Sequence, residues 1–304
     1  MPAIVSRRPR PQVWVLVGAL LGGLATTVPA PGAAAAARQL CSSSRDPALA
    51  ARLSQDIRDA LKGRDSTVSV AVHAPKSGLR CRLSDVRPYD SASIAKVLIM
   101  EAVLARAEEL GRPPTRLESQ RLKAMITRSD NDAATALWWG LSRERMKRVL
   151  REAGATDTIL GHDRYWGLTR TTARDQLALL AAVARRPAAL TLMGQVIHRQ
   201  AWGVGAGAPR GAKVHLKNGW LPRATHGWRV HSVGLVRGAG LDYRIALLSH
   251  DNETMTYGVR TLEGVALAVH RRLGGAAAAD RGFTPAEGIS EIPDGSAPAH
   301  DPAR

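Results

Sequence analysis

The sequence predicts an α/β fold of the α+β type, in which an antiparallel five-stranded sheet is flanked by helices and adjoins an all-α lobe. Two early segments and three late ones alternate polar and apolar residues with period two, as strands do. The long block between them has the period of amphipathic helices. Because the strand groups lie near opposite ends of the chain, they can form one sheet with the helical block inserted beside it. We expect a functional site in the cleft between the two lobes.

The individual elements follow in chain order. A helix is predicted at residues 46–62, where apolar residues recur every four positions, and strands at 67–72 and 79–83 are joined by the turn sequence PKSG. Helices are predicted at residues 95–110, 117–127, 132–139, 143–153 and 173–185, with Gly, Pro or Thr at the breaks. Period two returns in strands at 213–220, 228–236 and 243–249, and a last amphipathic helix spans 257–273.

The start of the chain is typical of an export signal. Arginines at positions 7, 8 and 10 precede an uncharged apolar run at 13–28 and small residues at 33–37, which predicts a cleavable signal peptide at residues 1–37. The run is shorter than the roughly 20 apolar residues of a membrane-spanning helix, so we expect no stable membrane insertion after cleavage. A retained anchor is the alternative, and the adjacent arginines also allow a twin-arginine route.

The remaining chain is long enough for one large domain of two lobes. We assign this domain to residues 38–274, with a sheet lobe at 38–92 and 212–274 and a helical lobe at 93–211. Residues 275–304 are rich in Ala, Gly, Pro and Asp without periodicity, which predicts a disordered tail.

Cysteines and charge restrict the class of protein. Cys41 and Cys81 both lie in the exported part, where an oxidising compartment favours a disulfide between them over two free thiols. The formal charge is +17, but the 43 basic residues are dispersed, whereas a nucleic-acid-binding surface needs them clustered with aromatics. We therefore expect no nucleic-acid partner, and nonspecific attraction to an anionic cell envelope. The nine histidines show no metal-ligand spacing, so no metal and no cofactor are predicted.

The stretch YDSASIAK places Ser93 and Lys96 three residues apart at the start of a predicted helix, and therefore on one face. A serine hydroxyl becomes a good nucleophile when a base takes its proton, and a lysine is such a base when burial, a neighbouring cation or a helix N-terminus lowers its pKa. Any capped helix with a lysine in its first turn gives the same pattern, so the structural alternative stays open. Ser91 is expected to be a local helix cap.

A second motif, Ser129-Asp130-Asn131, lies between two predicted helices. A hydroxyl and a carboxamide in one short turn can pass a proton and hold a substrate amide, while Asp130 fixes the turn. The alternative is an ordinary helix cap before the sequence DAATALWW.

A third motif, Lys217-Asn218-Gly219, lies on a predicted late strand. On an edge strand, a lysine can meet a substrate carboxylate and a glycine permits close backbone approach, which suits binding of an extended peptide. The alternative is an N-G hairpin turn.

In their order and spacing the three motifs resemble those of the penicillin-recognising serine enzymes, the class A β-lactamases and the DD-peptidases. The resemblance spans about residues 49–273 and includes the order of the secondary structure. It implies a β-lactamase/DD-peptidase-like fold and an exported serine hydrolase that forms an acyl-enzyme with a small-molecule β-lactam or a peptidoglycan-type D-alanyl peptide. We expect the protein to be a monomer.

Carried over residue by residue, the resemblance makes Ser93 the acylated nucleophile and Lys96 its proton acceptor. Ser129 would pass the proton toward the leaving nitrogen. The backbone amides of Ser93 and Trp220 would form the oxyanion hole.

The resemblance also implies substrate-binding residues. Asn131 would bind the substrate side-chain amide, and Lys217 would meet the carboxylate and help to depress the pKa of Lys96, while Gly219 allows close approach. At Asn218 the family usually has Thr or Ser, whose hydroxyl bonds to the substrate carboxylate. An Asn amide can donate the same bond but is bulkier, so the substrate range is expected to differ.

A larger departure lies in the sequence GHDRYWG. Class A β-lactamases carry there an Asp-Arg-aromatic-Glu pattern whose glutamate activates the deacylating water. Asp163, Arg164 and Tyr165 fit this pattern, but Trp166 follows, in a segment several residues short, and an indole cannot accept a proton. His162 and Asp163 are the nearest titratable substitutes, with Asp163 expected to pair with Arg164 and His162 to lie on the surface. The acyl-enzyme should therefore persist; the alternative is a penicillin-binding or cell-wall-binding domain without turnover.

Overall fold

The computed structural model describes residues 39–274 and Ala297. The predicted signal peptide, at residues 1–37, lies outside the described residues, as does the predicted tail apart from Ala297. Within the described part, no helix is both long enough and apolar enough to cross a membrane.

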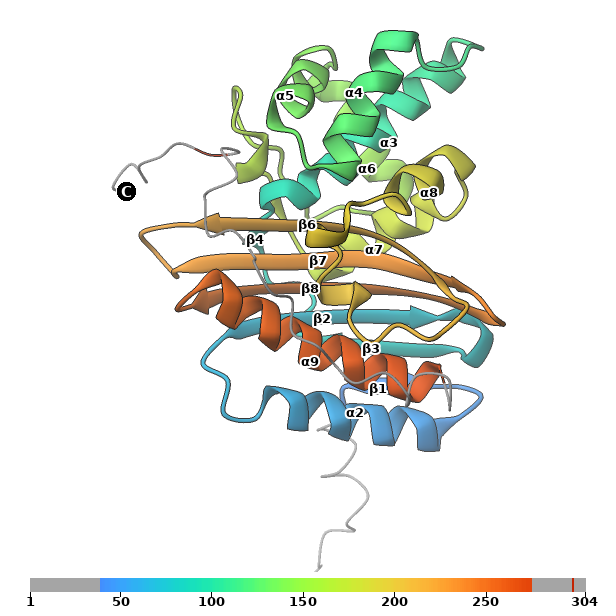
Figure 1. The fold of residues 1–304 in the computed structure, drawn as a ribbon, viewed down its shortest axis with the longest axis vertical. Helices are drawn as coiled ribbons and strands as arrows, with labels where there is room; N and C mark the ends of the chain where they lie inside the picture. The colour runs from blue at the N-terminus through green and yellow to red at the C-terminus, as the bar shows by residue number, and fades with distance from the viewer. Residues whose placement is uncertain (1–38, 275–296, 298–304) are drawn as a thin grey trace, which may run out of the picture. The chain divides into compact units, whose positions relative to one another are not determined.

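An antiparallel sheet forms the centre of the fold, as predicted, and it draws strands from both ends of the domain (Figure 1). Its strands run in the order β1-β3-β2-β8-β7-β6, so β6 lies at one edge. The strands are β1 (Cys41–Ser43), β2 (Thr67–Ala74), β3 (Leu79–Leu83), β6 (Lys213–Pro222), β7 (Trp228–Gly238) and β8 (Leu241–Asn252). The position of β6 confirms the expected edge strand.

The sheet has six strands where the sequence predicts five. The additional strand is β1, which is too short to show an alternating pattern and pairs with β3 so that Cys41 lies opposite Cys81. A disulfide joins these two cysteines, as expected. A second, two-stranded sheet, β4 (Tyr89–Asp90) with β5 (Arg170–Thr171), also escapes prediction because each strand has two residues.

Two helices cover one face of the sheet. They are α2 (Pro47–Leu61) and α9 (Met255–Leu273); α9 contacts β7 and β8, and it runs diagonally in front of the sheet in Figure 1. Their buried side chains, among them Leu53, Ile57 and Val265, share one apolar core with Val70, Ile245 and other residues of that face of the sheet. Burial of this surface stabilises the sheet lobe.

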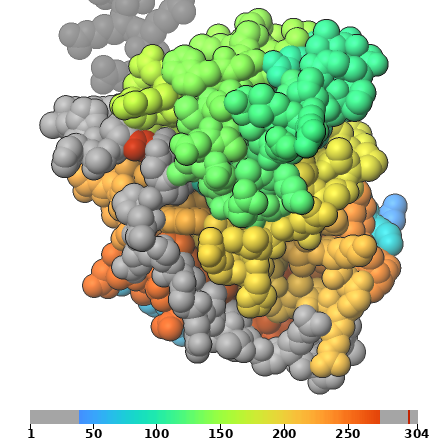
Figure 2. All heavy atoms as spheres, turned by 45° about the horizontal axis from the view of Figure 1, so that its top comes forward, coloured from blue at the N-terminus to red at the C-terminus, as the bar shows by residue number. Residues whose placement is uncertain are grey.

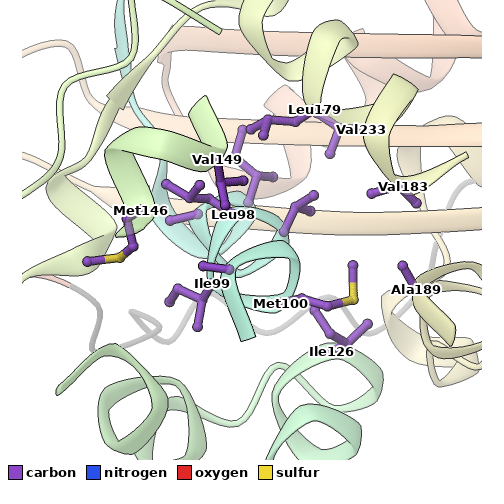
Figure 3. Close-up of a cluster of buried hydrophobic side chains, with 14 of the residues drawn as sticks. Leu98, Ile99, Met100, Ile126, Met146, Val149, Leu179, Val183, Ala189 and Val233 are labelled. Atoms are coloured by element: carbon purple, nitrogen blue, oxygen red, sulfur yellow. The ribbon is translucent and has the colours of Figure 1, made fainter. Parts of the chain in front are cut away.

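The opposite face of the sheet packs against the helical lobe. Its helices are α3 (Ala95–Glu109), α4 (Arg116–Thr127), α5 (Asn131–Trp139), α6 (Arg143–Ala153), α7 (Ala173–Val183) and α8 (Pro187–Met193). Most of α3 is buried, because other helices surround it; Figure 3 shows its Leu98, Ile99 and Met100 near Ile126 of α4 and Val149 of α6. All but α8 are predicted from the sequence; α6 has the predicted bounds, and the ends of the others differ by one or two residues.

Short 3-10 helices connect the longer elements. They are η1 (Pro75–Ser77), η2 (Ala92–Ile94), η3 (Trp166–Leu168), η4 (His198–Gln200) and η5 (Gly203–Gly205). In the space-filling view of Figure 2, the green surface of the helical lobe lies next to a yellow surface, which includes α8, and to orange strands of the sheet. The α8 helix contacts both α4 and β6, so it links the helical lobe to the edge strand.

Candidate active site

Ser93 lies in η2, two residues before α3 begins at Ala95. The preceding residue, Ala92, has a φ of 46°, a strained left-handed conformation for a residue with a Cβ. Ser91 occupies the N-cap position of η2, as expected, but its hydroxyl makes no capping bond with a described amide and instead donates to the carbonyls of Ala92 (3.4 Å) and Gly167 (3.5 Å). Its own amide donates to Thr169, which ties the segment before Ser93 to the η3 loop.

A chain of polar contacts joins the three motifs. Lys96 Nζ donates to Ser93 Oγ at 2.9 Å, to Ser129 Oγ at 2.9 Å and to Asn131 Oδ1 at 2.6 Å. Lys217 Nζ donates to the same Ser129 Oγ at 2.9 Å. The side chains of Ser93, Lys96 and Lys217 are fully buried. The structure therefore brings together the predicted nucleophile, base, shuttle and binding lysine, while the roles of these residues stay predictions.

The Ser129–Asn131 turn has the expected internal support. Asp130 caps α5 by accepting from the amide of Ala133 at 2.8 Å, so it fixes the turn, as predicted. Ser129 has a φ of 59°, and its carbonyl accepts a 2.6 Å bond from Lys96. The lysine thus holds both the backbone and the side chain of the turn.

The edge strand β6 passes directly beside the nucleophile. A Cβ on Gly219 would lie 2.8 Å from the amide nitrogen of Ser93 and 3.0 Å from the carbonyl oxygen of Ser91. These are backbone atoms that cannot rotate away, so this position needs glycine. Trp220 follows on the same strand; the oxyanion hole expected from its amide and that of Ser93 stays a prediction.

The expectation that the Asn218 side chain donates to a substrate carboxylate is wrong for this structure. Successive side chains of a strand point to opposite faces, so Asn218 faces away from Lys217. It is buried, and its Nδ2 donates to the carbonyls of Gln200 (2.8 Å) and Trp202 (3.0 Å). Both amide hydrogens are thereby used to hold the segment before η5.

Trp166 forms a wall of the site. Its indole is buried, its Nε1 donates to Thr135 Oγ1 at 3.1 Å, and the centre of its ring lies 4.7 Å from Lys96 Nζ. This distance is within the range of a cation–π interaction. An aromatic ring therefore borders the lysine on the side of the η3 loop.

The neighbouring loop residues point to solvent. His162 Nδ1 and Asp163 Oδ2 are 3.3 Å apart, and their side chains are 74% and 78% exposed, so His162 lies on the surface, as expected. The expected pair of Asp163 with Arg164 is wrong: Asp163 pairs with His162, and the Arg164 guanidinium lies 5.5 Å from the centre of the Tyr165 ring. Neither titratable group supplies a buried base.

Sequence reasoning missed one supporting residue, His231 on β7. It pairs in register with Gly219, and its ring contacts the carbonyl of Asp90 through Nε2 at 2.9 Å. Its Nδ1 accepts from the amide of Ser249 at 3.3 Å, and burial lowers the pKa of His231 to about 3. The neutral ring thus braces the strand that leads to Ser93. The sequence signal that could have revealed His231 is its position two residues before Val233, on the same buried face of the strand.

Two of three comparisons with known proteins find proteins that are similar to this chain. A model described as the Beta-lactamase enzyme family matches residues 111–273. A class A beta-lactamase from Bacteroides cellulosilyticus DSM 14838 is 18% identical, with a TM-score of 0.63 over 73% of this chain and 97% of that chain. A beta-lactamase from Sphaerobacter thermophilus DSM 20745 is 18% identical, with a TM-score of 0.61 over 73% and 97%. PBP-A is 17% identical, with a TM-score of 0.60 over 72% and 94%.

The likeness to these solved structures establishes the fold, which is that of the class A beta-lactamases and confirms the predicted fold class. A search of curated proteins finds no match.

Proposed function

The chain belongs to the beta-lactamase enzyme family, and on this basis we propose that it is an exported serine hydrolase that forms an acyl-enzyme on Ser93. Its substrates would be β-lactams or D-alanyl peptides. The observation that carries the proposal is the hydrogen-bonded chain from Ser93 through Lys96 to Ser129 and Lys217.

Acylation follows from this chain. Neutral Lys96 takes the proton of Ser93 Oγ across their 2.9 Å contact as the oxygen attacks the carbonyl carbon of the substrate amide. Burial of Lys96, and the positive charge of Lys217 at the same hydroxyl, favour the neutral form of Lys96 that this step needs. The carbon–nitrogen bond then breaks, which leaves an ester on Ser93.

The leaving nitrogen needs a proton, and Ser129 is placed to supply it. Its oxygen accepts from both Lys96 and Lys217, so its own hydrogen is directed away from both lysines and toward the substrate. Lys96 then passes the proton that it took from Ser93 to Ser129, which restores the Ser129 hydroxyl. Lys217 supplies a cation for the carboxylate of the substrate.

Deacylation is the step that we propose to be slow. It requires a water to attack the ester carbonyl while a base accepts a proton from that water. The indole of Trp166, which borders Lys96, cannot act as this base. Loss of a general base commonly costs about 10² to 10⁴ in rate, which is roughly 3 to 5 kcal/mol in the activation barrier.

Two further observations support the proposal. A single-residue mutant of PBP-A, a protein with this fold, was solved as an acyl-enzyme complex with penicillin G. The Cys41–Cys81 disulfide suits an oxidising, extracytoplasmic compartment, which agrees with the export predicted from residues 1–37.

Intact-mass measurement after mixing the protein with benzylpenicillin tests the proposal. We expect a single adduct of the mass of the β-lactam, which decays slowly and is absent in Ser93→Ala. Ser91→Ala is the matched control, because Ser91 is equally buried in the same segment, and it should still acylate. Absence of any adduct on the folded wild-type protein would contradict the acyl-enzyme.

A second candidate function is a penicillin-binding or wall-binding domain without turnover, and the position of Trp166 favours it. A chromogenic cephalosporin separates the two candidates. A burst of one equivalent of product, followed by slow turnover that disappears in Ser93→Ala, identifies the serine hydrolase. A burst with no further turnover identifies a penicillin-binding domain, and fast turnover without a burst refutes slow deacylation.

A further inference from the structure

Two histidines and an aspartate converge outside the Ser93 network, where the β6–β7 hairpin meets the end of β8. His226 Nδ1 and His250 Nδ1 each lie 2.7 Å from a different carboxylate oxygen of Asp251. One ligand atom from each residue lies within 4.8 Å of the others. We propose that these three side chains bind a divalent transition-metal ion of the zinc type.

The backbone holds the three residues in place before any ion binds. The amide of Asp251 donates to the carbonyl of His226 at 2.7 Å, and Gly227 forms a β-bridge with Asn252. His226 and Asp251 have φ values of 62° and 60°, which few residues other than glycine adopt. Such conformations persist where the surrounding structure enforces them and are frequent at ligand sites.

Side chains around the cluster orient its ligands. Thr67 Oγ1 donates to Asp251 Oδ2 at 2.5 Å, and the ring of Tyr89 packs against that of His250 with centroids 4.9 Å apart. Outer contacts of this kind fix the rotamers of ligating residues in metal sites. The His250 side chain is 10% exposed and that of His226 is 57% exposed, so one side of the cluster is open to an entering ion.

The donor set selects the class of ion. Two imidazole nitrogens and one carboxylate suit Zn²⁺, Co²⁺, Ni²⁺ or Cu²⁺, whereas Mg²⁺ and Ca²⁺ prefer sets made of oxygen. A tetrahedral ion needs ligand atoms roughly 3.3 Å apart, so each imidazole must withdraw only slightly from Asp251. Coordination through Nδ1 uses the lone pair of that nitrogen, so the ring proton of each metal-bound histidine lies on Nε2. A water completes the coordination.

Nearby positive charge sets a limit on affinity. Arg229 and Arg223 belong to the same hairpin and its flanks, and both pair with Asp90 at 3.6 Å and 3.9 Å. Asp90 partly neutralises the charge of both arginines, and Asp251 is the carboxylate that contacts the two imidazoles. We therefore expect a site that fixes the hairpin to β8 and responds to the concentration of free ion.

Co²⁺ is the probe for the test, because tetrahedral coordination gives it visible absorption bands. Titration of the tag-free full-length protein should saturate at one equivalent, and Zn²⁺ should displace the signal. His226→Ala removes an exposed ligand. Asp251→Asn removes the charge of the carboxylate, while asparagine has a similar shape and also tolerates the left-handed backbone conformation of this position. Each should weaken binding by at least about 10- to 100-fold, the loss typical even of outer-shell changes.

His198→Ala is the matched control, since His198 is exposed and lies in η4, outside the cluster. It should bind Co²⁺ as the wild type does. Thermal unfolding adds a second measurement: Zn²⁺ should raise the midpoint of the wild type and of His198→Ala but not of Asp251→Asn. Unsaturable binding by the wild type, or equal binding by His226→Ala, would overturn the proposal.

Discussion

Replacing Gly219 by alanine should separate the edge strand from the nucleophile. The new Cβ would lie 2.8 Å from Ser93 N and 2.9 Å from Ile94 N. To restore the 3.4 Å of an ordinary contact, β6 and η2 must move apart by roughly 0.6 Å. A misplacement of about 1 Å can cost about 100-fold in rate, so we expect acylation of Ser93 to slow by at least about 10-fold. Overpacking of this kind also destabilises a fold by about 1 to 3 kcal/mol.

Two measurements follow this change separately. Stopped-flow fluorescence with a fluorescent penicillin gives the acylation rate, and urea unfolding gives the free energy of unfolding. Gly264→Ala is the matched control. Gly264 lies inside α9, and its new Cβ would be 3.8 Å from the carbonyl oxygen of Ala60, which is an ordinary contact. The substitution should stabilise the helix by about 1 kcal/mol. If Gly219→Ala acylates at the wild-type rate and its free energy of unfolding is unchanged, the inference that β6 lies too close to Ser93 for a Cβ is refuted.

Three other changes probe the supports of the site. Replacing Cys41 and Cys81 by serine opens a loop with a sequence separation of 40, and the free energy of unfolding in urea should fall by about 4 kcal/mol. The pKa of His231 is about 3 in the folded protein and 6.5 in the unfolded chain, so a falling pH protonates the unfolded chain first and lowers the free energy of unfolding. Between pH 7 and pH 5 this loss should be about 2 kcal/mol. Urea titrations of His231→Gln at both pH values should lack this component. Asp130→Ala removes the cap of α5 and should lower the thermal midpoint by an amount equivalent to about 1 kcal/mol, whereas an unchanged midpoint would contradict the capping bond.

The long elements could be predicted because each carries its own periodic signal. The helix at Arg143–Ala153 and the strand at Leu79–Leu83 have the predicted bounds, since a serine cap precedes the former and turn residues precede the latter. The strands β1, β4 and β5 have two or three residues each, which is too few for a period to appear. They exist because distant segments pair with them, and such pairing is not encoded locally.

The site was predictable to the extent that its chemistry follows short motifs. Ser93, Lys96, Ser129 and Lys217 meet as the motif order implies. The direction of Asn218 was not predictable from its motif, because it depends on which face of β6 the helical lobe covers. The proposed metal-binding cluster could not be predicted for a similar reason. His226 precedes β7, whereas His250 and Asp251 lie near the end of β8, so only the pairing of these strands brings the three residues together.

More than one residue shapes the η3 loop beside Lys96. Trp166 is part of the apolar core of the helical lobe as well as the neighbour of Lys96. The loop around it is tight, since a Cβ on Gly161 would lie 2.2 Å from the carbonyl oxygen of Tyr165. Trp138 Nε1 fixes the other side of the loop by donating to the carbonyl of Asp163 at 2.7 Å. We therefore expect that a carboxylate in place of the indole would not by itself give rapid deacylation, because the tight backbone around it also determines where a base could lie.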